Sequence, residues 1–199
     1  MRIICLALAL LLVLSSQVSA ISSINLDVIK QAQAYGTSKF QADYSTFLAP
    51  WMSFEERAPK LDEFAERAYL YTPFLLIAID ARDKAGRGEK VEIEDSDKTL
   101  QDYSGYIIFS AVLFGGDATF VQGATATVKQ DKKIIKVAQS TIPAEAVKTA
   151  GPGGNSLYMS QCYFYFKEKD IFMDSPGMLV VSTQDKREHR FYFNIPQIR

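Results

Sequence analysis

The feature that most limits the fold is a run of short apolar or alternating segments, separated by turn residues, from residue 74 to the C-terminus. Short segments rich in aromatic and β-branched residues predict β-strands. Few helical patterns lie between them, which argues against parallel strands joined by crossover helices. About seven strands are expected, and the candidate segments are 74–81, 90–94, 105–114, 120–129, 133–139, 157–166, 178–183 and 188–195.

Two pairs of these segments are close enough in sequence to form hairpins. Segments 120–129 and 133–139 flank the turn Gln130-Asp131-Lys132, and the last two segments flank residues 184–187. Segment 105–114 is the most apolar stretch of the mature chain and predicts a central strand. The run Gly151-Pro152-Gly153-Gly154-Asn155 predicts a loop.

Residues 21–72 look helical instead. Asn25 or Ser23 is suited to cap a first helix that ends near Gly36. A second helical or turn-rich stretch covers residues 43–48.

A third helix is expected after a capping box formed by Ser53 and Glu56. Apolar residues continue at helical spacing from Leu61 to Tyr69, and Pro73 is expected to end this helix.

These patterns predict an α+β chain with an antiparallel β-sandwich, immunoglobulin-like in outline, preceded by a two- or three-helix N-terminal segment. The alternative is an antiparallel sheet covered on one face by those helices. The expected division is a signal peptide at 1–20, a helical segment at 21–72 that packs on the sheet, and a β-sandwich domain at 73–199.

The N-terminus carries the three parts of a Sec-type signal peptide. Met1-Arg2 is a short positive region, residues 3–14 are apolar, and Val18-Ser19-Ala20 has the small residues that precede cleavage. The apolar run of about 12 residues is short for a bilayer, which needs about 20. Cleavage is therefore expected after Ala20, and the mature protein is expected to be secreted or periplasmic.

The mature chain has 23 acidic and 21 basic residues, so its charge gives no reason to expect nucleic acid as a partner. No later segment is apolar enough to span a membrane. Cys162 is the one cysteine that remains, which leaves burial or an intermolecular disulfide as its alternatives. The oligomeric state is left open by the sequence.

Most catalytic chemistries are disfavoured by the residue content. His189 is the single histidine, so sites that need two imidazoles are excluded. A serine triad would need His189 as its base, yet no Gly-x-Ser-x-Gly motif is present. The glycine run at 151–154 lacks the Lys-Ser/Thr ending of a phosphate-binding loop. We therefore expect a non-catalytic protein with no cofactor.

Four carboxylates lie close together at Glu92, Glu94, Asp95 and Asp97. Calcium takes six to eight oxygen ligands, and a loop of this composition could supply several of them. The spacing matches no EF-hand loop, and no glycine turn lies inside it. A solvated acidic loop beside an edge strand is the alternative interpretation.

Tyrosines form the other candidate site. In a strand over 157–166, Cys162 shares a face with Phe164 and Phe166, whereas Tyr163 and Tyr165 lie on the opposite face together with Met159. Such a face is suited to bind peptides, sugars or another sheet. The alternative is that the helical segment covers it, with Trp51, Phe54 and Phe64 packing there.

The sequence therefore predicts an exported binding or structural module of the periplasm or cell envelope. Its expected partner is an envelope or secreted protein, or a peptide, at the Tyr163/Tyr165 face. The alternative is a module that binds a small ligand or calcium through residues 92–97.

Overall fold

The computed structural model describes residues 24–199, and the expected signal peptide at 1–20 lies outside this range. Within residues 24–199 the fold is α+β, with four α-helices and two antiparallel sheets of six and four strands. The helices are α1 (Leu26–Ser38), α2 (Tyr44–Leu48), α3 (Pro73–Gly86) and α4 (Ile93–Asp102).

The larger sheet has the strand order β1-β2-β3-β8-β6, and β7 also pairs with β8. Its strands are β1 (Met52–Phe54), β2 (Arg67–Tyr71), β3 (Tyr106–Gly115), β6 (Gln139–Thr141), β7 (Val147–Ala150) and β8 (Ser156–Lys167). The smaller sheet has the order β10-β9-β4-β5. Its strands are β4 (Thr125–Gln130), β5 (Lys133–Lys136), β9 (Gly177–Ser182) and β10 (Glu188–Phe193).

The two sheets share one hydrophobic core. Phe109 on β3 has its ring centroid 5.7 Å from that of Phe166 on β8 and 5.2 Å from that of Phe193 on β10. Cys162 and Phe164 on β8 are also completely buried in this core. Every second side chain of β3 and β8 thus faces the smaller sheet, because successive side chains of a strand point to opposite faces.

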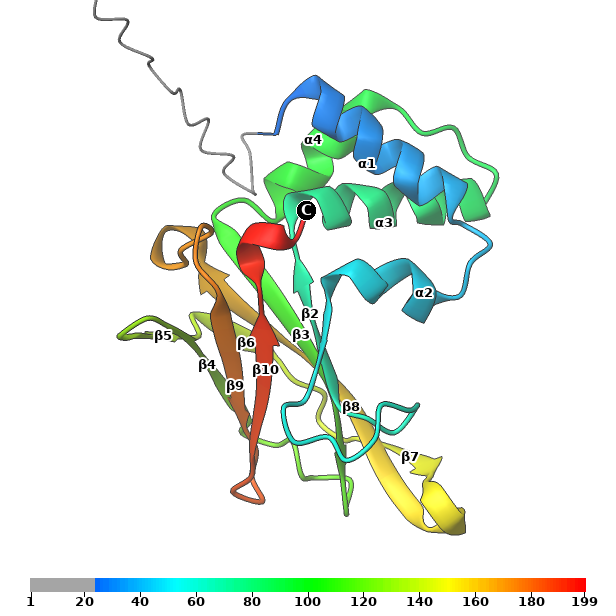
Figure 1. The fold of residues 1–199 in the computed structure, drawn as a ribbon. Helices are drawn as coiled ribbons and strands as arrows, with labels where there is room; N and C mark the ends of the chain where they lie inside the picture. Colours follow the sequence, from blue (N-terminus) through cyan, green and yellow to red (C-terminus); the bar gives the residue numbers. More distant parts are fainter. Residues whose placement is uncertain (1–23) are drawn as a thin grey trace, which may run out of the picture.

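The helices cover the opposite face of the larger sheet (Figure 1). A second apolar cluster joins α1 and α3 to side chains of β2 and β3. Trp51, the single tryptophan, is buried in this cluster and stacks on Phe74 of α3 at 6.0 Å. Its indole N–H donates to the carbonyl of Arg199 at 2.7 Å, so the C-terminal residue contacts the helical layer.

Helices α1 and α3 pack closely at Gly36. A Cβ at this position would overlap the carbonyl oxygen of Ala78 and lie 3.0 Å from the amide nitrogen of Arg82. Both contacts are with backbone atoms, which cannot rotate away. A glycine at residue 36 thus sets the distance between the two helices.

The variant Gly36→Ala is expected to lower the free energy of unfolding by about 2 kcal/mol, because α1 must shift away from α3. Alanine favours a helix over glycine by about 1 kcal/mol, which offsets part of the loss. Gly86→Ala is the matched control, since nothing lies within 4 Å of its added Cβ. Urea unfolding of both variants checks this, and equal stabilities would contradict the close packing.

Several predicted elements are confirmed. Asn25 caps α1 through a hydrogen bond from the amide of Val28, and Asp43 caps α2 in the same way. The central strand is β3, and the two predicted hairpins are β4–β5 and β9–β10.

The helix predicted over 53–69 is wrong. The chain instead forms β1, a loop and β2, and β2 pairs with β3. Ala68 and Leu70 face the core between the sheets, whereas Tyr69 and Tyr71 face the helices. A strand buried on both faces is apolar at consecutive positions, and such a short run can match helical spacing.

The strand predicted over 74–81 and the helix end at Pro73 are also wrong. Pro73 begins α3 instead, in the first turn, where its missing N–H removes no hydrogen bond. Thr72 caps the helix by accepting a hydrogen bond from the amide of Leu75 at 3.2 Å. The continuous apolar run belongs to a helix that packs against α1 on one side and the sheet on another.

Candidate functional site

A groove of about 560 Å³ lies between the helices and the outer face of the larger sheet. It is lined by residues of α2, α3 and α4 and by residues of β2, β3, β6 and β8. Its polar side chains are mainly tyrosine and aspartate, and no lysine or arginine of the part of the chain that the structure describes lines it. We call it the tyrosine groove; its tyrosines are Tyr44, Tyr71, Tyr103, Tyr163 and Tyr165, and its aspartates are Asp80, Asp83 and Asp102.

The strand register brings the central tyrosines together. Tyr71 on β2 lies opposite Ile108 on β3, and Ile108 lies opposite Tyr165 on β8. The rings of Tyr71 and Tyr163 lie 6.1 Å apart at an angle of 57°. Tyr163 and Tyr165 are half-buried on the face opposite Cys162, as the alternation of the sequence predicts.

The buried tyrosines keep their hydroxyl protons. Burial raises the pKa of Tyr71 and of Tyr163 above the ordinary tyrosine value. Because that ordinary value is already about 10, both side chains are neutral at physiological pH. The hydroxyl of Tyr71 already bonds to Ser110 and Tyr163, so the half-buried Tyr163 is the one of the two that can donate a hydrogen bond to a ligand in the tyrosine groove.

The aspartates give the tyrosine groove a negative charge. Asp80 and Asp83 come from α3, and Asp102 comes from the last turn of α4. Asp80 forms an ion pair with Lys84 at 3.4 Å. Within residues 24–199, neither Asp83 nor Asp102 has an ion-pair partner. Two exposed carboxylates are thus available to a cation.

The structure places two of the three predicted surface residues in the tyrosine groove. Tyr163 and Tyr165 line it, but Met159 does not. Met159 lies on the same face of β8, four residues from Tyr163, which is about 13 Å along a strand. Its neighbours on the adjacent strands are Phe114 of β3 and Val147 of β7.

The groove residues on β2 and α3 were missed because their segments were misassigned. On a helix, Leu76, Ile79, Asp80 and Asp83 follow the spacing i, i+3, i+4 and i+7, which places them on one face. The same residues on a strand would fall on both faces. A helical assignment of 73–86 would therefore have pointed to this site.

The acidic stretch at 92–97 is not a loop, and the edge strand expected at 90–94 is absent from the described chain. Glu92 caps α4 in a capping box with Asp95, and Glu94 and Asp97 lie in the helix. Asp95 also bonds Lys84 at 2.6 Å, and this contact lowers the pKa of its carboxyl. No group of metal-ligating side chains occurs among the described residues. The carboxylates are dispersed on a helix rather than converging on a cation.

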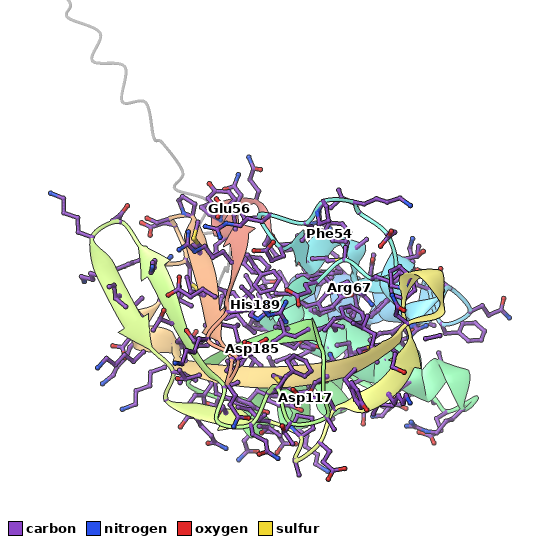
Figure 2. All side chains as sticks on the ribbon, turned by 90° about the horizontal axis from the view of Figure 1, so that it is seen from below. Phe54, Glu56, Arg67, Asp117, Asp185 and His189 are labelled. Atoms are coloured by element: carbon purple, nitrogen blue, oxygen red, sulfur yellow. The ribbon has the colours of Figure 1, made fainter. Side chains whose placement is uncertain are left out.

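His189 lies in a buried polar cluster at the β9–β10 end of the sheets. Its Nδ1 is 2.5 Å from Oε2 of Glu66, and its Nε2 is 3.1 Å from Oγ1 of Thr183. Thr183 in turn donates to Asp185 at 2.6 Å. Figure 2 shows His189 and Asp185 close together at this end.

The order carboxylate, imidazole, hydroxyl has the spacing of a catalytic triad, but the hydroxyl of Thr183 is closer to Asp185, at 2.6 Å, than to Nε2 of His189, at 3.1 Å. A base must accept the hydroxyl proton, whereas Thr183 donates it to Asp185. Glu66 comes just before β2 and accepts a hydrogen bond from the amide of Phe114 in β3, whereas His189 lies in β10. The contact between Glu66 and His189 therefore links the larger sheet to the smaller one, which favours a structural role.

No family model matches the chain, and no curated protein matches it either. Among the described residues, no helix has both the length and the apolar character needed to cross a membrane.

Proposed function

We propose that the mature chain is an exported, non-catalytic binding module of the periplasm or cell envelope. Its tyrosine groove binds a basic segment of another protein or a basic peptide. The observation that carries the proposal is one groove lined by five tyrosines and three aspartates, two of which have no ion-pair partner in the described chain. Export rests on the N-terminal leader pattern.

The chemistry of the tyrosine groove favours a cationic side chain over other ligands. The face of a tyrosine ring attracts an ammonium or guanidinium group by about 0.5–2 kcal/mol, depending on desolvation. Asp83 and Asp102 add charge attraction at the rim. The molecule already shows such a contact, because the guanidinium of Arg82 stacks over the ring of Tyr44 at 4.9 Å.

A rigid scaffold supports this role. We infer that the two sheets form a sandwich, since their inner faces share the core that contains Phe109 and Phe193. The immunoglobulin-like outline stays a prediction. Helices α3 and α4 hold one side of the groove against this scaffold.

Selection of random dodecapeptides displayed on phage, using residues 21–199 as bait, tests the proposal. We expect selected sequences to be enriched in arginine and lysine. The variant Asp83→Asn/Asp102→Asn should weaken a selected peptide about tenfold, because two rim charges are each worth up to about 1 kcal/mol. Tyr163→Ala should weaken binding of the same peptide by a similar factor, because the contact between its cationic group and the tyrosine ring is lost.

The matched control is Glu94→Gln/Asp97→Asn, which removes two exposed carboxylates of α4 outside the tyrosine groove. Its affinity should equal that of the unchanged protein. Equal losses in both double variants would mean that overall charge, not the groove, attracts the peptide. Selected peptides without basic residues would contradict the proposed ligand class.

A further inference from the structure

A second surface lies at the free edge of the smaller sheet. β5 is the last strand in the order β10-β9-β4-β5, and among residues 24–199 it pairs with β4 alone. Its register is fixed by the pairs Gln130↔Lys133 and Val128↔Ile135. The strand is part of a hairpin with a two-residue turn, Asp131-Lys132.

The backbone of β5 has unpaired hydrogen-bonding groups on its outer side. In such a hairpin the closing pair exchanges hydrogen bonds, and pairs then alternate between bonded and non-bonded. Ile134 and Lys136 are in the non-bonded pairs, so their N–H and C=O groups point away from β4. The bond from Val137 N–H to Ala126 C=O, at 3.2 Å, agrees with this alternation.

The same row of outward groups continues into the larger sheet. Ala138, two residues beyond Lys136, donates its N–H to the carbonyl of Tyr165 at 2.9 Å. In the described chain, Ile134 and Lys136 have no such backbone partner. The outward backbone groups of Ile134 and Lys136 are therefore free to pair with another strand, whereas the N–H of Ala138 is already bonded.

A groove of about 570 Å³ runs between this edge and residues 167–172. Four lysines line it, with Asp170 as the one acidic residue among its lining. None of the four forms an ion pair with another residue of the described chain. These lysines, which we call the lysine edge, are Lys133, Lys136, Lys167 and Lys169.

Lysines on an edge strand often prevent pairing with other strands. Here an apolar side chain lies between them: Ile134 is 65% exposed, in the middle of the open edge. Phe172 also lines the groove, with the ammonium of Lys133 4.2 Å from its ring centroid. Apolar surface beside unpaired backbone groups and cations suits a strand whose side chains alternate between apolar and acidic.

We propose that the lysine edge binds an acidic, extended segment of a partner protein, which pairs with β5 as a fifth strand of the smaller sheet. Backbone groups of Ile134 and Lys136 supply the hydrogen bonds, and the four lysines supply the charge selectivity. This site is separate from the tyrosine groove, and its ligand has the opposite charge.

The test uses a fluorescein-labelled octapeptide of alternating glutamate and valine, with fluorescence anisotropy as the readout on residues 21–199. We expect saturable binding that weakens at least tenfold when glutamine replaces glutamate. A peptide methylated on every backbone nitrogen should also bind at least tenfold more weakly, because neither of its edges can donate hydrogen bonds to β5. Equal binding of the methylated peptide would overturn strand pairing and leave charge attraction alone.

Charge reversal at Lys133→Glu/Lys169→Glu should also weaken binding at least tenfold. Lys30→Glu/Lys148→Glu makes the same change in total charge at exposed positions outside the groove, and should leave the affinity unchanged. Hydrogen exchange tests strand pairing on the unchanged protein. The peptide should slow exchange at the amides of Ile134 and Lys136, and protection confined to other residues would overturn the proposal.

Discussion

Replacing His189 with alanine is expected to lower the free energy of unfolding by about 3 kcal/mol. Leaving a buried polar group without its hydrogen-bond partner costs about 1–3 kcal/mol, and more for an acidic group such as that of Glu66. Glu66 would keep its hydrogen bond from the amide of Phe114 and its contact with Arg187 at 3.8 Å, so the loss should stay near the top of this range. Urea denaturation at neutral pH measures the loss.

Two further variants identify the source of that loss. Tyr192→Ala on the same strand is the control, since Tyr192 is 55% exposed and should cost less than about 1 kcal/mol. Glu66→Leu/His189→Leu removes both members of the pair and should recover much of the stability, because neither polar group is left buried without its partner. If His189→Ala were as mild as the control, the cluster would not hold the two sheets together.

Phe109→Ala is expected to cost about 4 kcal/mol. Truncation of a buried phenylalanine typically costs 3–5 kcal/mol, from lost apolar contact and the cavity that remains. Phe109 is 1% exposed and contacts aromatic rings of both sheets, so the cavity has little freedom to collapse. Thermal and urea unfolding give the value.

Tyr106→Ala on the same strand is the matched control. Tyr106 is 39% exposed, and its loss should have a small effect. A cost below about 1 kcal/mol for Phe109→Ala would contradict a core shared by the two sheets. The conservative variant Phe109→Leu should fall between the two, since it keeps most of the apolar volume.

The β region after residue 105 was largely predictable because its signals are local. The apolar run at 105–114, the turn at 130–132 and the turn at 184–187 each identify a strand or a hairpin within a few residues. The alternation around Cys162 even assigned the faces of β8 correctly.

The region from 53 to 102 was not predictable in the same way. The segment 74–81 is apolar on all sides, because α3 lies between α1 and the sheet, so it shows no amphipathic period. Pro73 marks a helix start as readily as a helix end. Both ambiguities are resolved by packing with segments distant in the sequence.

The tyrosine groove shows the consequence of that error. Tyr163 and Tyr165 were identified from one strand, but Tyr71 comes from a segment expected to be helical. Asp80 and Asp83 come from α3, in a segment expected to be a strand and the turn after it. The acidic character of the tyrosine groove therefore could not be predicted without the correct assignment of α3.

The position of Trp51 allows the two layers of the molecule to be observed separately. The chain's single indole lies in the cluster between the helices and the larger sheet, whereas the core between the two sheets contains none. Intrinsic fluorescence excited at the indole band thus reports selectively on detachment of the helical layer. Circular dichroism of the backbone reports on all elements, so agreement or divergence of the two melting curves shows whether the layers unfold as one cooperative unit.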